Sequence, residues 1–179
     1  EQAQSVNTIC FNNGDLVGHN TDISGFQKAI NSLNYEIKDK KILILGAGGV
    51  VPSLIIALNK MEASEITITN RTSKKAEDLK IQFNKINTVS WGEVPDFDMI
   101  INATSLGLNN ETIDLNTSNI GQGKFFYDVI YNPNETNFLK LGKKLGNQIE
   151  NGKLMFIYQA FEAFRSVSYT HLRAHETAD

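Results

Sequence analysis

The chain has 179 residues, 41% of them hydrophobic and 21% charged, which is about the length of one globular domain. With 3 prolines and 13 glycines, and no apolar run near the roughly 18 residues of a membrane span, neither a fibrous nor a membrane protein is expected. A formal net charge of -3 gives no electrostatic reason to expect nucleic acid as a partner, and leaves a small, weakly acidic molecule as a candidate.

The single cysteine, Cys10, cannot form a disulfide within the chain and has no zinc-site spacing around it. A reducing cytoplasm is therefore the expected location. The sequence opens without an initiator methionine or a signal segment. We expect it to be a fragment of a longer protein.

Residues 166–179 differ from the rest, because the apolar periodicity stops there and His171 and His175 appear. Codons that could encode residues 167–176 resemble a transposase sequencing adapter. We expect this tail to be foreign to the fold. A metal-binding His-x-x-x-His pair is the alternative interpretation.

The first predicted element is a hairpin, with strands at residues 6–11 and 16–19 and a turn at Asn12-Asn13-Gly14-Asp15. A helix is expected at 23–33, because Phe26, Ile30 and Leu33 recur at helical spacing. Thr21 or Asp22 is the expected cap of that helix.

From residue 42 onward, apolar runs alternate with helical patterns. Strands are expected at 42–45, 66–69, 99–102 and 125–129, and helices up to about residue 61 and at 74–83, 139–145 and 156–164. Parallel neighbours need a crossover connection, so strand and helix alternation is typical of a parallel sheet. The pattern predicts an α/β fold.

A glycine-rich turn, Gly46-Ala47-Gly48-Gly49, lies where the strand at 42–45 meets the following helix. A dinucleotide pyrophosphate can bind at such a helix N-terminus. Val51 occupies the third glycine position of the usual fingerprint, so a glycine turn that only joins strand to helix is the alternative. Pro52 fits the first helical turn, and no P-loop motif occurs.

About 20 residues after the glycines, an NAD-binding domain places an acidic residue on the ribose hydroxyls. Here Asn70 is followed by Arg71, Thr72 and, one turn later, Lys75. A carboxylate would repel a 2′-phosphate, whereas an amide, a hydroxyl and two cations can bind it. The segment favours NADP over NAD, and a solvated helix start is the alternative.

Seven motifs together resemble those of the shikimate dehydrogenase family, in the same order. They are Ser-Val-Asn-Thr at 5–8, Gly-His-Asn-Thr-Asp-Ile-Ser-Gly at 18–25, Gly-Ala-Gly-Gly at 46–49, Asn-Arg-Thr at 70–72, Asn-Ala-Thr-Ser-x-Gly at 102–107, Asp-x-x-Tyr-Asn-Pro-x-x-Thr at 128–136 and Asn-Gly-x-x-Met-x-x-x-Gln-Ala at 151–160. The resemblance implies NADPH-dependent reduction of 3-dehydroshikimate to shikimate in aromatic amino-acid biosynthesis. It also implies a Rossmann-like, doubly wound parallel sheet domain and the C-terminal remnant of an α/β substrate domain, with the active site in the cleft between them.

Carried over by motif, the substrate contacts are Asn7, Thr21, Asp22, Tyr131 and Gln159. Asp22 would also be catalytic, paired with the family's catalytic lysine, because a ketone that accepts hydride needs a proton donor. When each residue is considered alone, the alternative interpretation is that Asp22 is a helix cap, Asn7 a turn amide and Gln159 a solvent-facing helix residue. The implied cofactor contacts are Gly46, Ala47, Gly48, Gly49, Asn70, Arg71, Thr72, Lys75, Ala103, Thr104, Ser105, Val129, Gly152 and Met155.

The resemblance divides the chain into the end of a substrate domain (1–22), a cofactor domain (23–150), a returning helix (151–165) and the foreign tail (166–179). In the family the catalytic lysine lies upstream of the motif at 5–8, and we do not expect Lys28, Lys38, Lys40 or Lys41 to replace it. We expect the chain to bind NADP weakly and to show no turnover. Shikimate-dependent formation of NADPH would contradict this.

Two alternatives stay open: a quinate/shikimate dehydrogenase that uses NAD, and a nucleotide-binding module without turnover. A short-chain dehydrogenase is excluded, because no tyrosine has a lysine four residues later. No metal, membrane or nucleic acid is expected, and the resemblance is compatible with a homodimer.

Overall fold

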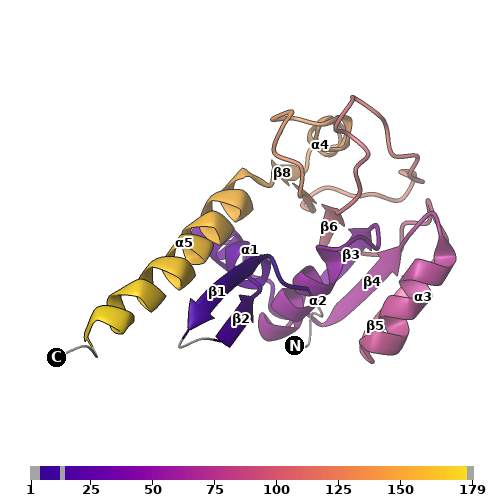
Figure 1. Cartoon of the computed structure of the whole chain (residues 1–179). Coiled ribbons are helices and arrows are strands. Elements are labelled where there is room, and N and C mark those ends of the chain that lie inside the picture. Colours follow the sequence, from indigo (N-terminus) through magenta and orange to yellow (C-terminus); the bar gives the residue numbers. More distant parts are fainter. Residues whose placement is uncertain (1–4, 13–14, 177–179) are drawn as a thin grey trace.

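The computed structural model describes residues 5–12 and 15–176, which form the helices and strands labelled in Figure 1. In chain order they are β1 (Thr8–Asn12), β2 (Asp15–His19), α1 (Asp22–Ser32), β3 (Lys41–Leu45), α2 (Val51–Lys60), β4 (Glu65–Thr69), α3 (Ser73–Gln82), β5 (Ile86–Val89), β6 (Met99–Asn102), β7 (Phe125–Asp128), α4 (Asn137–Lys144), β8 (Gln148–Glu150) and α5 (Lys153–Glu176).

Six strands form one parallel sheet in the order β5-β4-β3-β6-β7-β8. The chain moves outward from β3 to β5 and then returns to the other side of β3 with β6. The sheet is therefore doubly wound, and the order in which strands are added reverses between β3 and β6. The predicted α/β fold is confirmed. The pattern missed β5 and β8, which are the two edge strands, because each is short and neither carries a continuous apolar run.

The central strands are buried on both faces, which explains their uninterrupted apolar sequences. Successive side chains point to opposite faces of a sheet. Ile42 and Ile44 accordingly pack in a cluster with helices α1, α2, α3 and α5. Leu43 and Leu45 pack in a second cluster with α4 and with the long segment between β6 and β7. One face is therefore covered by helices and the other largely by loops.

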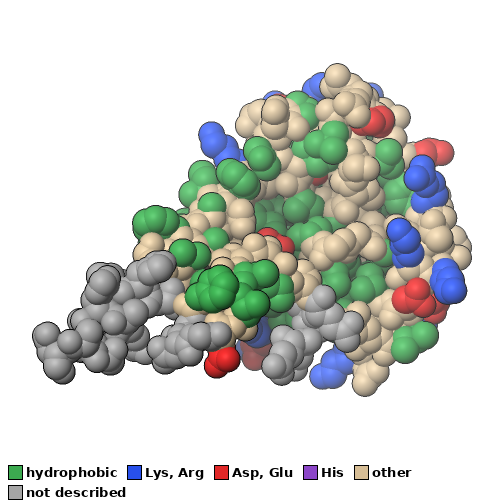
Figure 2. All heavy atoms as spheres, viewed as in Figure 1, with side chains coloured by type: hydrophobic (Ala, Val, Ile, Leu, Met, Phe, Trp, Pro, Cys, Tyr) green, Lys and Arg blue, Asp and Glu red, His purple; other side chains and the backbone are tan. Residues whose placement is uncertain are grey.

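The predicted hairpin is confirmed, since β1 and β2 pair in antiparallel register with Cys10 opposite Val17. Residues 13 and 14 of the predicted turn lie outside the described residues. Cys10 is buried, whereas Ile9, Phe11 and Leu16 are 64%, 75% and 66% exposed. Figure 2 shows hydrophobic side chains gathered over this hairpin. Among the described residues, no helix is both long enough and apolar enough to cross a membrane.

The start of α1 differs from the prediction, because neither Thr21 nor Asp22 caps the helix with its side chain. Instead the Asn20 Oδ1 atom accepts hydrogen bonds from the backbone N–H groups of Asp22 (3.1 Å) and Ile23 (3.4 Å). Thr21 has helical backbone angles (φ -93°, ψ -8°), whereas a capping residue is usually extended. Its hydroxyl is thereby left to bind elsewhere.

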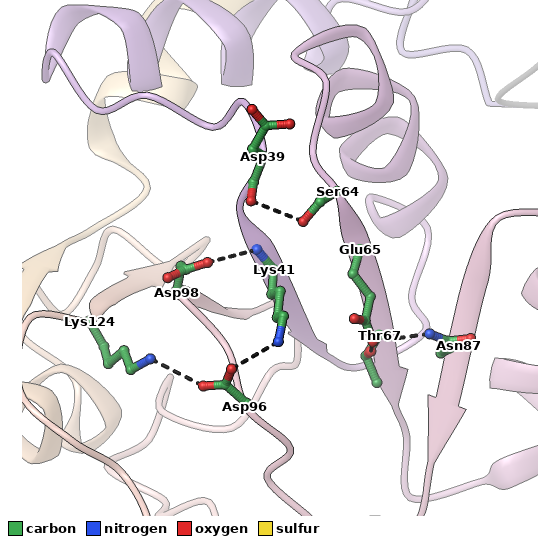
Figure 3. A network of polar contacts seen from close by, with 9 residues as sticks. All are labelled: Asp39, Lys41, Ser64, Glu65, Thr67, Asn87, Asp96, Asp98 and Lys124. Atoms are coloured by element: carbon green, nitrogen blue, oxygen red, sulfur yellow. Dashed lines mark hydrogen bonds and ion pairs between the residues drawn. The ribbon is translucent and has the colours of Figure 1, made fainter.

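The amino ends of the strands are tied together by polar contacts, shown in Figure 3. The Asp96 carboxylate accepts from Lys41 Nζ (3.0 Å) and Lys124 Nζ (3.3 Å), and Asp98 Oδ2 accepts from the Lys41 backbone N–H (2.9 Å). Asn87 Nδ2 donates to Glu65 Oε1 (3.0 Å) from the neighbouring strand. These contacts stabilise the sheet at the amino ends of its strands. The clefts described below lie at the carboxyl ends.

The last helix is longer than expected, since α5 runs from Lys153 to Glu176, against a prediction of 156–164. Its backbone is helical through the segment where the apolar periodicity ends. The side chains of His171 and His175 lie outside the described side chains. Among the described residues, no group of three His, Cys, Asp or Glu side chains is placed to hold a metal ion. The foreign origin of residues 166–179 stays a prediction.

Candidate active site

A cleft of about 360 Å³ lies at the carboxyl ends of β3, β4 and β6, where the winding of the sheet reverses. Such a switch point is where open α/β sheets bind their ligands. The cleft is lined by Gly46, Ala47, Gly48, Asn70, Arg71, Thr72, Lys75, Trp91, Ala103, Thr104, Ser105 and Leu106. Ten of the residues that the motifs predicted for the cofactor are therefore brought together from three separate segments, whereas Gly49, the next residue after Gly48, is not among the lining residues.

The glycine turn brings the backbones of two neighbouring strands unusually close. Gly46 has φ +111°, and a Cβ atom built on it would lie 2.8 Å from the carbonyl oxygen of Ala103. Its own N–H donates to the Thr69 carbonyl (2.7 Å). Helix α2 begins directly after this turn, with Pro52 in the first turn and without a side-chain cap at Val50. An anion in the cleft would therefore meet an uncapped helix N-terminus.

We expect Gly46→Ala to lower the free energy of unfolding by about 2 kcal/mol. A residue with a side chain is strained at this positive φ, and its Cβ atom would also clash with the backbone of Ala103. Gly49→Ala is the matched control. A Cβ on Gly49 would have no neighbour within 4 Å and no positive φ to adopt, so its stability should change by less than about 1 kcal/mol. Denaturant unfolding of both variants measures the difference, and equal stabilities would contradict the prediction.

The cationic side of the cleft comes from the end of β4. Asn70 Nδ2 donates to the carbonyl oxygen of Thr72 (2.8 Å), which folds this segment into a tight turn at the start of α3. Arg71 and Lys75 are exposed and both line the cleft. Two cations thus face the space beside the glycine turn, where a carboxylate would stand in an NAD site.

Sequence reasoning missed Trp91 and Leu106, which also line this cleft. Both side chains pack against the loop-covered core cluster. Leu106 belongs to the motif at 102–107 but stands at its unspecified position. Trp91 belongs to no motif, and only its place after β5, the strand beside β4, could have suggested it.

A second cleft, of about 420 Å³, shares Ala103 and Thr104 with the first and continues along the ends of β6 and β7. Its other lining residues are Val50, Leu108, Val129, Ile130, Tyr131 and Asn132. Tyr131 is 44% exposed and its ring stacks on Phe156 of α5, with centroids 4.7 Å apart. A long ligand could pass from one cleft to the other over Ala103 and Thr104.

The wall between the clefts is held by a buried polar network centred on Asp128. Its carboxylate accepts from Asn102 Nδ2 (3.0 Å), the Ile130 N–H (3.0 Å) and the Thr136 hydroxyl (2.6 Å). Asn102 Oδ1 in turn accepts from the N–H and the hydroxyl of Thr104. The motif residues Asn102, Asp128 and Thr136 therefore position the wall from behind.

Gly152 and Met155 are not among the residues that line the two clefts. Gly152 packs against the chain that leaves β7, where a Cβ atom on it would lie 2.0 Å from the Val129 carbonyl oxygen. Met155 is 5% exposed and belongs to the helix-covered core. These two residues lie behind Val129, which does line the second cleft.

Four of the five predicted substrate residues form one polar cluster. Asn7 Nδ2 donates to Asp22 Oδ1 (3.0 Å), and Asn7 Oδ1 accepts from the Thr21 N–H (3.0 Å) and hydroxyl (3.2 Å). The Thr21 hydroxyl also lies 3.3 Å from Gln159 Oε1 on α5. This last contact is possible because α1 and α5 touch at Gly25, where a Cβ would lie 2.7 Å from Gln159 Cβ.

Burial raises the pKa of the Asp22 carboxyl above its ordinary value, and the hydrogen bond from Asn7 offsets part of that rise. Three of the four lysines that were not expected to serve this carboxyl have other partners. Lys28 pairs with Glu162, Lys38 with Glu62, and Lys41 with Asp96. The cluster therefore supplies an acid group beside amide and hydroxyl groups.

Comparison with known proteins gives consistent matches. A family model described as shikimate / quinate 5-dehydrogenase matches residues 27–136. A curated shikimate dehydrogenase (NADP(+)) of Pelagibacter ubique is 55% identical over 165 residues, which cover 92% of this chain and 62% of that protein. The chain thus spans less than two thirds of the length of that relative.

Solved structures agree in fold. Shikimate 5-dehydrogenase from Thermus thermophilus, in complex with NADP(H) and shikimate, matches with a TM-score of 0.83 and 30% identity over 92% of this chain and 62% of that one. Quinate dehydrogenase from Corynebacterium glutamicum, in complex with NAD, matches with a TM-score of 0.82 and 27% identity over 92% and 62%. The Rossmann-like, doubly wound character expected for the sheet is confirmed.

Proposed function

The chain belongs to the shikimate / quinate 5-dehydrogenase family, and we propose that it binds NADP in the first cleft and serves the interconversion of 3-dehydroshikimate and shikimate. The observation that carries this proposal is that the glycine turn after β3 and the cations Arg71 and Lys75 line the same cleft, at the point where the winding of the sheet reverses. The pyrophosphate would lie at the N-terminus of α2. Arg71, Lys75 and Thr72 would hold the 2′-phosphate.

The nicotinamide end is proposed to reach the second cleft over Ala103 and Thr104. A bound NADPH supplies the hydride for a ketone, and the oxygen of that ketone then gains negative charge and needs a proton. Asn7, Thr21, Asp22 and Gln159 would bind the hydroxyl groups of the substrate, since their amide, hydroxyl and carboxyl groups provide both donors and acceptors. Asp22 would orient the proton donor, and Tyr131 would close the site from the cofactor side.

Replacing both cations, Arg71→Ala with Lys75→Ala, is expected to weaken NADP binding by about tenfold to hundredfold, because charge-assisted hydrogen bonds to the 2′-phosphate are lost. NAD affinity should stay within about threefold, since NAD carries no such phosphate. Lys74→Ala is the matched control, because Lys74 belongs to the same helix but is not among the lining residues. Isothermal titration with both nucleotides tests this, and equal losses for NADP and NAD would contradict it.

Two alternatives remain as second candidates, and each has its own test. An NAD-using quinate/shikimate dehydrogenase is favoured only if the chain binds NAD more tightly than NADP. A nucleotide-binding module without a substrate is favoured if shikimate, added with NADP, leaves the side-chain amide NMR signals of Asn7 and Gln159 unchanged. We expect both signals to shift, because these amides face the proposed substrate position.

The division of the chain at residues 22, 150 and 165, all direct contacts with cofactor or substrate, and the homodimer stay predictions. A cytoplasmic location is proposed from the unpaired Cys10 thiol and the biosynthetic role. The mass of the assembly in solution tests the homodimer.

A further inference from the structure

We propose that Trp91 provides an aromatic wall for the adenine ring of the bound nucleotide and determines affinity for that half of the cofactor. The inference rests on the proposed NADP site and deepens it. Trp91 lines the same cleft as Arg71 and Lys75, which are the residues proposed for the 2′-phosphate. The adenosine half of NADP carries that phosphate, so its base must lie near those cations.

The fold places Trp91 at this end of the cleft. It follows β5, which pairs with β4 in parallel register, so both strands end at the same edge of the sheet. Arg71 follows the end of β4 and Trp91 the end of β5. The glycine turn after β3 lies on the other side of β4. Moving outward from β3, the cleft therefore offers in turn an anion site, a cationic segment and an indole ring.

The turn that carries Trp91 is fixed on both sides. The Ser90 carbonyl accepts from the buried Thr69 hydroxyl (2.9 Å) and from the Glu93 N–H (3.1 Å), and the Ser90 N–H donates to Glu93 Oε2 (3.0 Å). The Gly92 carbonyl accepts from the Asn116 N–H (3.1 Å). A turn fixed in this way leaves only the side-chain torsions of Trp91 to be ordered when a ligand stacks on the ring.

The chemistry of the wall fits a heterocyclic base. Trp91 and Leu106 both line the cleft and both pack against the core behind it, so they present apolar surface beside the exposed cations. Stacking of a base on an aromatic side chain contributes substantially to binding and needs no specific hydrogen bonds. A purine ring beside a 2′-phosphate matches this arrangement of apolar and cationic surface.

The only tryptophan of the sequence is Trp91, so its fluorescence reports on this position alone. We expect its emission to change on titration with 2′,5′-ADP, which carries the base and the 2′-phosphate, at the same concentrations at which calorimetry detects binding. NMN, which lacks adenine, should leave the emission unchanged. Calorimetric binding of 2′,5′-ADP without any change in emission would overturn the proposal and leave the proposed function intact. Absence of NADP binding by both methods would overturn both.

Two variants separate stacking from packing. Trp91→Phe keeps a ring face and should retain most of the affinity for 2′,5′-ADP, whereas Trp91→Leu keeps apolar bulk without a ring and should lose about tenfold. Thermal unfolding of both variants shows that they remain folded at the assay temperature. If Trp91→Leu binds 2′,5′-ADP as tightly as the unaltered chain, the proposal is wrong.

Discussion

Gly152→Ala is expected to lower the free energy of unfolding by about 3 kcal/mol or more, the upper range for overpacking. The new Cβ would lie 2.0 Å from the Val129 carbonyl oxygen and 2.6 Å from its carbonyl carbon. Neither atom can move without shifting the backbone after β7. The Gly152 N–H also donates to the Ile130 carbonyl (3.2 Å), so the start of α5 and the floor of the second cleft are disturbed together. Denaturant unfolding measures the loss.

Gly121→Ala is the matched control, because a Cβ there would meet nothing within 4 Å. Its stability should change by less than about 1 kcal/mol. The experiment also tests the predicted cofactor contact of Gly152. A Gly152→Ala chain that keeps its stability and loses NADP binding would contradict the packing argument and favour direct contact with the cofactor.

Asp128→Ala is expected to cost about 3 kcal/mol or more, because it leaves the buried N–H groups of Asn102 and Ile130 without their acceptor. Asp128 and Asn102 are both fully buried, so bulk water does not reach the groups that lose their acceptor. Thr136, which caps α4 through a hydrogen bond from the Leu139 N–H, loses its partner as well. We expect NADP affinity to fall too, since Asn102 holds Thr104 in the wall between the clefts. Denaturant unfolding and nucleotide titration measure the two effects.

Asp128→Asn is the conservative control, because its amide oxygen can still accept from Asn102 and Ile130.

The same variant tests how the Asp128 carboxyl affects the pH dependence of stability. Burial raises the pKa of Asp128 above 3.8, and the hydrogen bonds offset only part of that rise. The folded protein therefore holds this proton more tightly than the unfolded chain does. Asp128 makes stability fall as pH rises from about 3.8 to the folded pKa, and Asp128→Asn should remove that fall. The free energy of unfolding is measured at several pH values across this range for both proteins. The same pH dependence in both would contradict the prediction.

Much of the proposed nucleotide site was predictable, because its residues are close in sequence to the strand ends that carry them. Gly46 follows β3 and Asn70 follows β4 directly. A periodic apolar pattern locates such strand ends, and parallel strands bring them to one edge. The same logic failed for Trp91, because β5 is a short edge strand with Asn87 and Thr88 in its middle and gave no signal.

The cap of α1 shows a different limit. Thr21 and Asp22 are both good capping residues by type, yet Asn20 does the capping and Thr21 binds Asn7 and Gln159 instead. Residue type alone does not distinguish these outcomes. They depend on whether a second partner lies within reach of the hydroxyl.

The sequence by itself determined the alternation of strands and helices, the glycine turn and the cationic segment, because these follow from local spacing and from the conformations that glycine and proline allow. Only the tertiary structure decided which distant groups meet. Thr21 and Gln159 are separated by 138 positions, and they meet because α1 and α5 pack at Gly25. Gly152 and Met155 likewise lie behind the cleft wall because α5 docks there. Such contacts depend on how helices pack on one another, which no local pattern specifies.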